Sequence, residues 1–197
     1  MRTLPPPRSA LMLAPLLLAA LAGCSTHGFP RLGSMGAGPA AVPGAVAPAR
    51  LTPYERDFAI RSAAKGMYEV EVSRLAVERA VDRGVRAYAQ KLVREHTQVN
   101  GELIALLSAR GIAPPKGLAA DRATKLHRLA ALPPSAAFDN GYIRVVGIED
   151  HRTTIAGLER ARREVQDREL RAWIDKTLFA LRNHLAEAQN LVGTLAG

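Results

Sequence analysis

Apolar residues recur every three or four positions through most of residues 52–197, and this spacing constrains the fold more than any other feature. One such run comprises Val85, Tyr88, Leu92, His96, Val99, Leu103 and Leu106. A period of about 3.5 residues places these side chains on one face of an α-helix. Because sustained alternation of polar and apolar residues is absent from the sequence, we expect an all-α domain.

Start and stop signals divide this segment into helices. Thr52 followed by Pro53 and Glu55 forms a capping box. Further N-caps are expected at Ser135 and Asp167. These signals predict long helices over about 52–82, 85–110, 136–165 and 168 to nearly the C-terminus, with a shorter helix over about 118–131.

The turns between these helices predict their arrangement. The first and second long helices are joined by a short turn, as are the third and fourth, while a long connection separates the two pairs. We therefore expect a ferritin-like four-helix bundle with the short helix in the crossover between helices 2 and 3.

The N-terminus has the organisation of a bacterial lipoprotein signal peptide. Arg2 and Arg8 precede an apolar run over residues 10–20, which is shorter than the roughly 20 residues needed to span a bilayer. The tetrapeptide Leu-Ala-Gly-Cys follows at residues 21–24 and contains the single cysteine of the chain. We expect cleavage just before Cys24 and its acylation, which anchors the protein to a membrane.

The chain then divides into a signal peptide (1–23), a lipidated cysteine with a flexible Gly/Pro/Ala-rich tether (24–51) and the bundle (52–197). Ser25, not aspartate, follows the cysteine. The resemblance to lipoproteins therefore implies a periplasm-facing outer-membrane protein of the bacterial cell envelope.

The charge of the chain is strongly basic. The formal net charge is +9, and removal of residues 1–23 leaves 25 basic and 18 acidic residues, a net charge of +7. Such a surface favours anionic lipid or cell-wall polymer as partners. Export and the lack of a basic patch interleaved with aromatic residues argue against nucleic acid.

Three of the five histidines, His96, His151 and His184, lie in the apolar stripes of three different long helices, each near the helix midpoint. Glu71 lies at a corresponding depth on the first helix, and its helical position predicts that it points inward. Glu69 is expected on the solvated side. We therefore predict a central polar layer of Glu71 and the three histidines within an aliphatic core.

Two interpretations of this layer remain open. Three imidazoles and a carboxylate suit one transition-metal ion, such as zinc, copper, iron or manganese. Alternatively, the layer is a metal-free hydrogen-bond network that fixes the register of the helices. In the metal interpretation, four acidic residues are available to orient the ring N–H groups: Glu78, Glu95, Glu149 and Asp150.

The ligand motif of ferritin oxidases is absent. That di-iron chemistry needs a glutamate three residues before a histidine on two helices. The residues three positions before the central histidines are Val93, Ile148 and Leu181. Neither iron storage nor oxygen activation is therefore expected on this ground.

Several segments resemble a bacterial exported family, domain of unknown function 4142. The resemblance rests on residues 64–71 (AKGMYEVE), residues 136–139 (AAFD), and the acid–histidine pairs at 95–96 and 150–151, and it covers about residues 55–190. It implies an exported protein with a ferritin-like fold, and it implies no established biochemical role.

The sequence favours a non-catalytic binding or envelope-stress function, without catalytic residues, for a lipid-tethered bundle. A metal-dependent redox enzyme that handles peroxide or superoxide is the first alternative. A structural envelope protein that binds anionic lipid or cell-wall polymer is the second.

Overall fold

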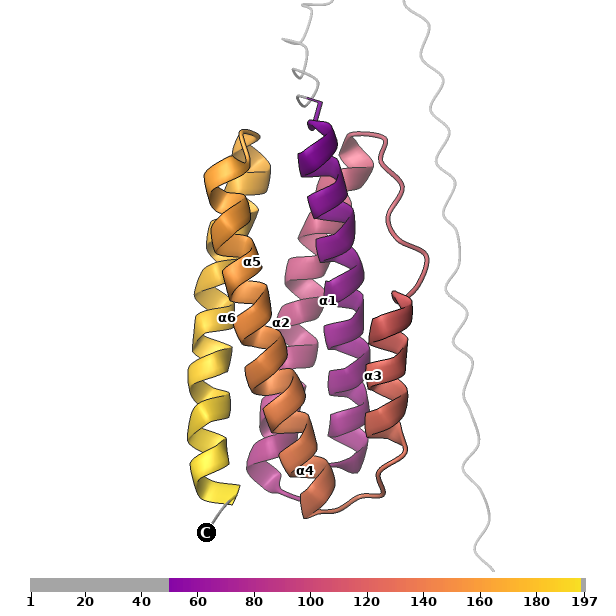
Figure 1. The fold of residues 1–197 in the computed structure, drawn as a ribbon, viewed down its shortest axis with the longest axis vertical. Coiled ribbons are helices and arrows are strands. Elements are labelled where there is room, and N and C mark those ends of the chain that lie inside the picture. The colour runs from indigo at the N-terminus through magenta and orange to yellow at the C-terminus, as the bar shows by residue number, and fades with distance from the viewer. Residues whose placement is uncertain (1–49, 196–197) are drawn as a thin grey trace, which may run out of the picture. The chain divides into compact units, whose positions relative to one another are not determined.

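The computed structural model describes residues 50–195, and the helices in this range form one bundle (Figure 1). The first pair of long helices is α1 (Pro53–Arg79) and α2 (Arg83–Ala109). The short helix α3 (Ala120–Ala130) follows in the connection. The third long helix is built from α4 (Ala136–Tyr142), the π-helical segment η1 (Ile143–Asp150) and α5 (His151–Glu164), and the fourth is α6 (Arg168–Leu195).

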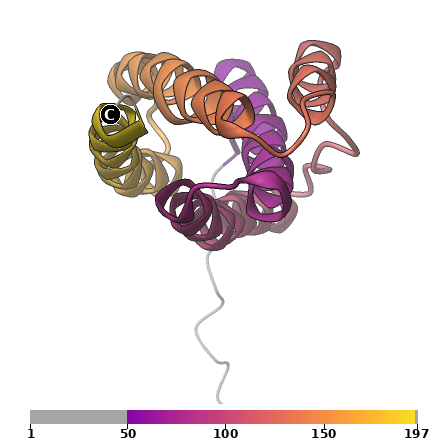
Figure 2. The same cartoon turned by 90° about the horizontal axis from the view of Figure 1, so that it is seen from below.

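The connections give the bundle the expected topology. Short turns join α1 to α2 and α5 to α6, so each pair is antiparallel. The long connection runs back along the bundle, and α3 packs against α1 outside the ring of four long helices (Figure 2). The all-α, ferritin-like bundle with a short crossover helix is thus confirmed. No helix within residues 50–195 has the length and hydropathy required to cross a membrane.

The helix ends follow the predicted local signals. Thr52 and Glu55 form a complete capping box, in which the Thr52 hydroxyl accepts from the Glu55 N–H and the Glu55 carboxylate accepts from the Thr52 N–H at 2.8 Å. Ser135 and Asp167 cap α4 and α6 through the N–H groups three residues later. Gly111 has a φ of +68°, a left-handed conformation that suits glycine just after α2.

Two buried carboxylates connect the helix pairs at opposite ends of the bundle. Glu55 of α1 accepts backbone N–H groups of residues 166 and 167, in the turn before α6, at 2.6 and 2.8 Å. Asp139 of α4 accepts the N–H groups of residues 81 and 82, in the turn before α2, at 3.2 and 2.7 Å. Each pair of helices therefore satisfies the backbone of the turn that joins the other pair.

The third long helix contains a π-helical segment that the sequence analysis did not predict. Within η1, Gly147 packs so close to α6 that an added Cβ would lie 2.8 Å from the Cβ of Ala188. The missing side chain therefore permits close approach of η1 to α6. π-Helical segments are rare in proteins, and those that occur are often found at functional sites. The position of η1 directly before His151 therefore marks His151 as a candidate functional residue.

Candidate metal centre

The three predicted histidines meet in the middle of the bundle. His96 of α2, His151 of α5 and His184 of α6 are 8%, 1% and 1% exposed. One ring nitrogen from each lies within 4.8 Å of the corresponding nitrogens of the other two. Their ring centroids are 5.3–5.6 Å apart. The predicted convergence of the three imidazoles is therefore present.

His151 is fixed by a backbone carbonyl of η1. Its Nδ1 lies 2.8 Å from the carbonyl oxygen of Val146. Since a carbonyl oxygen only accepts hydrogen bonds, Nδ1 carries the proton. Burial lowers the pKa of His151 to about 4, so the ring is neutral at pH 7. Its Nε2 consequently presents a lone pair, and this nitrogen faces His184.

His184 lies between a carboxylate and His151. Its Nε2 is 2.7 Å from Oε2 of Glu95, and its Nδ1 is 3.3 Å from Nε2 of His151. Burial lowers the pKa of His184 although the hydrogen bond to Glu95 opposes this shift. A neutral His184 whose Nε2–H donates to the carboxylate presents a lone pair at Nδ1. The lone pairs of His184 and His151 then face each other.

His96 completes the cluster with a third nitrogen. Its buried Nε2 has no hydrogen-bond partner among residues 50–195. Burial, with smaller contributions from His151 and His184, lowers the pKa of His96 well below its usual value. Three neutral imidazoles thus converge, and their unprotonated nitrogens can hold a metal ion. Two nitrogens bound about 2.0–2.1 Å from a tetrahedral zinc lie about 3.3 Å apart, which matches the His151–His184 separation.

The carboxylate of the central layer is Glu69, and the prediction for Glu71 is wrong. Glu71 is exposed and pairs with Arg74 at 2.7 Å on the surface of α1. Glu69 is 3% exposed, and its Oε2 has no hydrogen-bond partner among the described residues. Burial and the charge of Asp150 raise the pKa of Glu69 to about 8.

The error has a physical source in α1. Glu71 was expected to point inward because it shares a face of α1 with Met67, Leu75 and Glu78, but Met67 and Leu75 are half-buried and Glu78 is exposed. The buried face instead follows small residues at helical spacing, which allow close packing: Ala59, Ala63, Ser73, Ala76 and Ala80. Extending this small-residue spacing places position 69 on the buried face and position 71 outside it. That spacing was the signal that could have identified Glu69.

Only one of the four predicted orienting acids contacts a central histidine ring in the described structure. Glu95 binds His184 as expected. Glu78 and Glu149 are exposed, so these two assignments are wrong. Glu78 lies on the solvent-facing side of α1, and Glu149 lies on the solvent-facing side of η1.

Asp150, the fourth predicted acid, is buried, but its hydrogen bonds go to other residues. Its Oδ1 accepts from Arg122 at 2.9 Å and from Lys125 at 2.6 Å, and Oδ2 accepts from the Tyr68 hydroxyl at 3.2 Å. Arg122 and Lys125 belong to α3. Asp150 therefore holds the crossover helix and does not orient His151.

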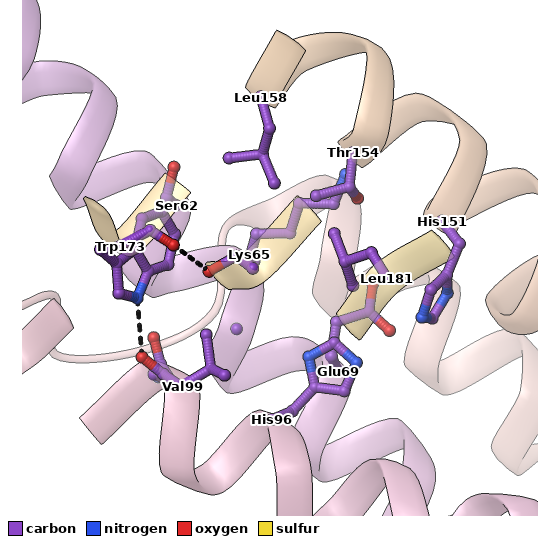
Figure 3. Close-up of a pocket in the computed structure, with 13 residues that line it drawn as sticks. Ser62, Lys65, Glu69, His96, Val99, His151, Thr154, Leu158, Trp173 and Leu181 are labelled. Carbon is purple, nitrogen blue, oxygen red and sulfur yellow. Dashed lines mark hydrogen bonds between the residues drawn. The ribbon is translucent and has the colours of Figure 1, made fainter. Parts of the chain in front are cut away.

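A cavity of about 50 Å³ lies beside the histidines. Its polar lining includes Glu69, Asn100, His96 and His151, and Figure 3 shows Glu69 directed toward the side of the two rings. Apolar walls come from Val99, Leu158, Trp173 and Leu181. The Trp173 indole N–H donates to the Val99 carbonyl at 2.9 Å, which fixes one wall (Figure 3).

Comparisons with known proteins agree with the fold. A family model described as Domain of unknown function (DUF4142) matches residues 40–191. The crystal structure of a DUF305 fragment from Deinococcus radiodurans superposes with a TM-score of 0.66 and 16% sequence identity. That match covers 74% of this chain and 99% of the other. The likeness to this fragment concerns the fold. No protein among the curated set matches the chain.

Proposed function

The chain belongs to the family known as domain of unknown function DUF4142, and on this premise we propose that its bundle binds one first-row transition-metal ion at His96, His151 and His184. The observation that carries the proposal is the hydrogen bonding of two rings. Val146 and Glu95 accept the N–H groups of His151 and His184, which leaves the opposite ring nitrogens 3.3 Å apart.

A carboxylate or a backbone carbonyl on the outer nitrogen is the usual surrounding of a metal-bound histidine, because it fixes the tautomer and directs the lone pair at the metal. Three neutral imidazoles suit zinc, copper or iron, and the ion that is taken up depends on supply. A metal-free hydrogen-bond layer requires a different protonation state of His184. There His184 can donate both to Glu95 and to His151 only when both of its ring nitrogens are protonated.

Elemental analysis of the full-length chain tests the proposal. We expect about one transition-metal ion per chain after equilibration with zinc, and loss of that ion in the His96→Ala/His184→Ala double variant. His127→Ala is the matched control, since His127 is exposed on α3. Retention of metal by the double variant, or no uptake by the wild-type chain, would contradict the proposal.

The proposal includes location. Acylation of Cys24 would anchor the protein to the outer membrane with the bundle in the periplasm, and the tetrapeptide at residues 21–24 supports this. These residues lie outside the described range. Cys24→Ser should abolish acylation and membrane retention, and continued retention of the variant would refute the anchor.

We propose binding, and not catalysis, as the primary role. The positions that would supply the glutamates of a di-iron oxidase hold Val93, Ile148 and Leu181. Peroxide turnover by the metal-loaded chain that is lost in His151→Ala would instead favour a redox enzyme.

A further inference from the structure

All the buried side-chain polar atoms that have no hydrogen-bond partner within residues 50–195 belong to residues that line one cavity. They are Oε2 of Glu69, Nε2 of His96 and Oδ1 of Asn100. Glu69 and Asn100 are 3% and 8% exposed. An unsatisfied buried polar atom is costly. The proposed metal would bind Nε2 of His96, so the oxygens of Glu69 and Asn100 indicate a site whose hydrogen bonds are made to a further ligand.

The cavity is large enough for a small molecule. A single water needs roughly 10–15 Å³ of such space, and the cavity offers about 50 Å³. A molecule of two to four heavy atoms therefore fits, whereas a drug-sized ligand does not.

The polar atoms define the chemistry of that molecule. Asn100 Oδ1 only accepts hydrogen bonds, so the ligand must donate one. The carboxyl group of Glu69 accepts when ionised and donates when protonated, so a hydroxyl group suits it in either state. Beside these two groups, a metal ion held by three histidines would keep a coordination position that is open to a lone pair.

A surface groove adjoins the cavity. A neighbouring groove between α1 and α5 is lined by Phe58, Arg61, Thr153 and Gly157 and shares Ser62, Lys65, Thr154 and Leu158 with the cavity. Figure 3 shows Ser62, Lys65 and Thr154 at the opposite side of the cavity from His96. The groove and the cavity therefore adjoin each other between α1 and α5.

We propose that this cavity binds a small hydroxylic molecule of hydrogen-peroxide or hydroxylamine size, which coordinates the metal through a lone pair and hydrogen-bonds to Glu69 and Asn100. This inference rests on the proposed function, because it needs the metal at the three histidines. It assigns Glu69 and Asn100 as binding residues for the ligand, not for the metal.

Gly66 supports the position of Asn100. A Cβ on Gly66 would lie 2.6 Å from Oδ1 of Asn100, so the amide lies directly against the backbone of α1. The glycine therefore leaves room for a polar side chain that satisfies no protein partner through Oδ1 within the described residues. An apolar side chain at position 100 would fill the same space without an unsatisfied oxygen.

The test uses the full-length chain loaded with cobalt(II), whose visible absorption reports coordination changes. Hydroxylamine is titrated as the probe, with methoxyamine as the probe that lacks the O–H group. We expect saturable spectral changes with hydroxylamine in the wild type, and at least about fivefold weaker binding in Glu69→Leu and in Asn100→Leu. Glu71→Leu, an exposed change two residues from Glu69, should bind as the wild type does.

The outcomes separate the two proposals. Stoichiometric cobalt without any response to hydroxylamine, or with equal affinity in all variants and for both probes, overturns the ligand site and leaves the metal site intact. Absence of bound cobalt from the wild type overturns both. Cobalt stoichiometry and circular dichroism are measured for each variant, and either Glu69→Leu or Asn100→Leu alone suffices if the other does not fold.

Discussion

The Nε2 atom of His184 lies 2.7 Å from Oε2 of Glu95, a residue that reaches it from a different helix. This contact determines which nitrogen of His184 carries the proton. Because the ring has a lowered pKa, the proton that Glu95 accepts leaves Nδ1 unprotonated and directed at His151. Glu95 therefore controls the direction of the lone pair that His184 offers to a metal. Among the described residues, it forms no hydrogen bond with His96 or His151.

Glu95→Gln should weaken metal affinity about 10- to 100-fold, the usual effect of removing a carboxylate that supports a metal-bound histidine. The amide preserves shape but permits the other His184 tautomer. The measurement is competition with a chromophoric zinc chelator. Glu149→Gln is the control, because Glu149 is exposed and lies two residues before His151. Equal affinity of both variants and the wild type would argue against the assigned role of Glu95.

Features set by local interactions could be predicted from the sequence. Capping at Thr52, Ser135 and Asp167 depends on residues within three positions, so the helix boundaries followed closely. His96 and His184 were found because each lies among large apolar residues on a strongly amphipathic helix. The helical period of the apolar residues was sufficient to place these two histidines in the core.

Features set by contacts between distant segments could not be predicted. Glu71 shares a face of α1 with Met67 and Leu75, but contacts with the other helices bury the face of Glu69 instead. Asp150 looked like a partner for the adjacent His151, but Arg122 and Lys125 in the crossover helix bind it. The π-helical segment likewise packs closely against α6 at Gly147, a contact that no local pattern encodes.

Glu69→Gln should stabilise the metal-free protein in a pH-dependent manner. Burial, then Asp150, raises the pKa of Glu69 from 4.5 to about 8, so the unfolded state releases the proton more readily than the folded state. The contribution of Glu69 to stability is therefore full below about pH 4.5 and is lost as the pH rises through about 8. The Glu69→Gln variant has no carboxyl group at position 69 to titrate, so its free energy of unfolding does not decrease for this reason.

Urea unfolding at several pH values checks this expectation. The free energy of unfolding of Glu69→Gln should match that of the wild type near pH 4.5 and exceed it by about 1–3 kcal/mol at pH 8. Glu71→Gln, on the surface of the same helix, should show no such divergence. If Glu69→Gln increased the free energy of unfolding by the same amount at every pH, titration of Glu69 would not be the cause of the increase.

Asp150→Ala should release the crossover helix. Asp150 is 2% exposed and binds Arg122, Lys125 and Tyr68, and removal of one partner from a buried ion pair leaves charge without compensation. We expect a loss of about 3 kcal/mol. Hydrogen exchange over residues 120–130 should accelerate, whereas His127→Ala, a change at an exposed residue of α3, should leave it unchanged.

Gly147→Ala should perturb both stability and metal binding, because its Cβ would lie 2.8 Å from the Cβ of Ala188. Neither atom can rotate away, so η1 and α6 must separate, at a cost of about 1–3 kcal/mol. Ala188 lies one turn after His184 on α6, and the separation would therefore move His184 away from His151.

The matched rescue is Gly147→Ala/Ala188→Gly, which restores the space from the other helix. Glycine within α6 costs about 1 kcal/mol, so the double variant should recover metal affinity more fully than stability. A double-mutant cycle on both quantities measures this coupling. Additive effects on affinity would show that the close approach of η1 and α6 does not position the histidines, and that the glycine serves packing alone.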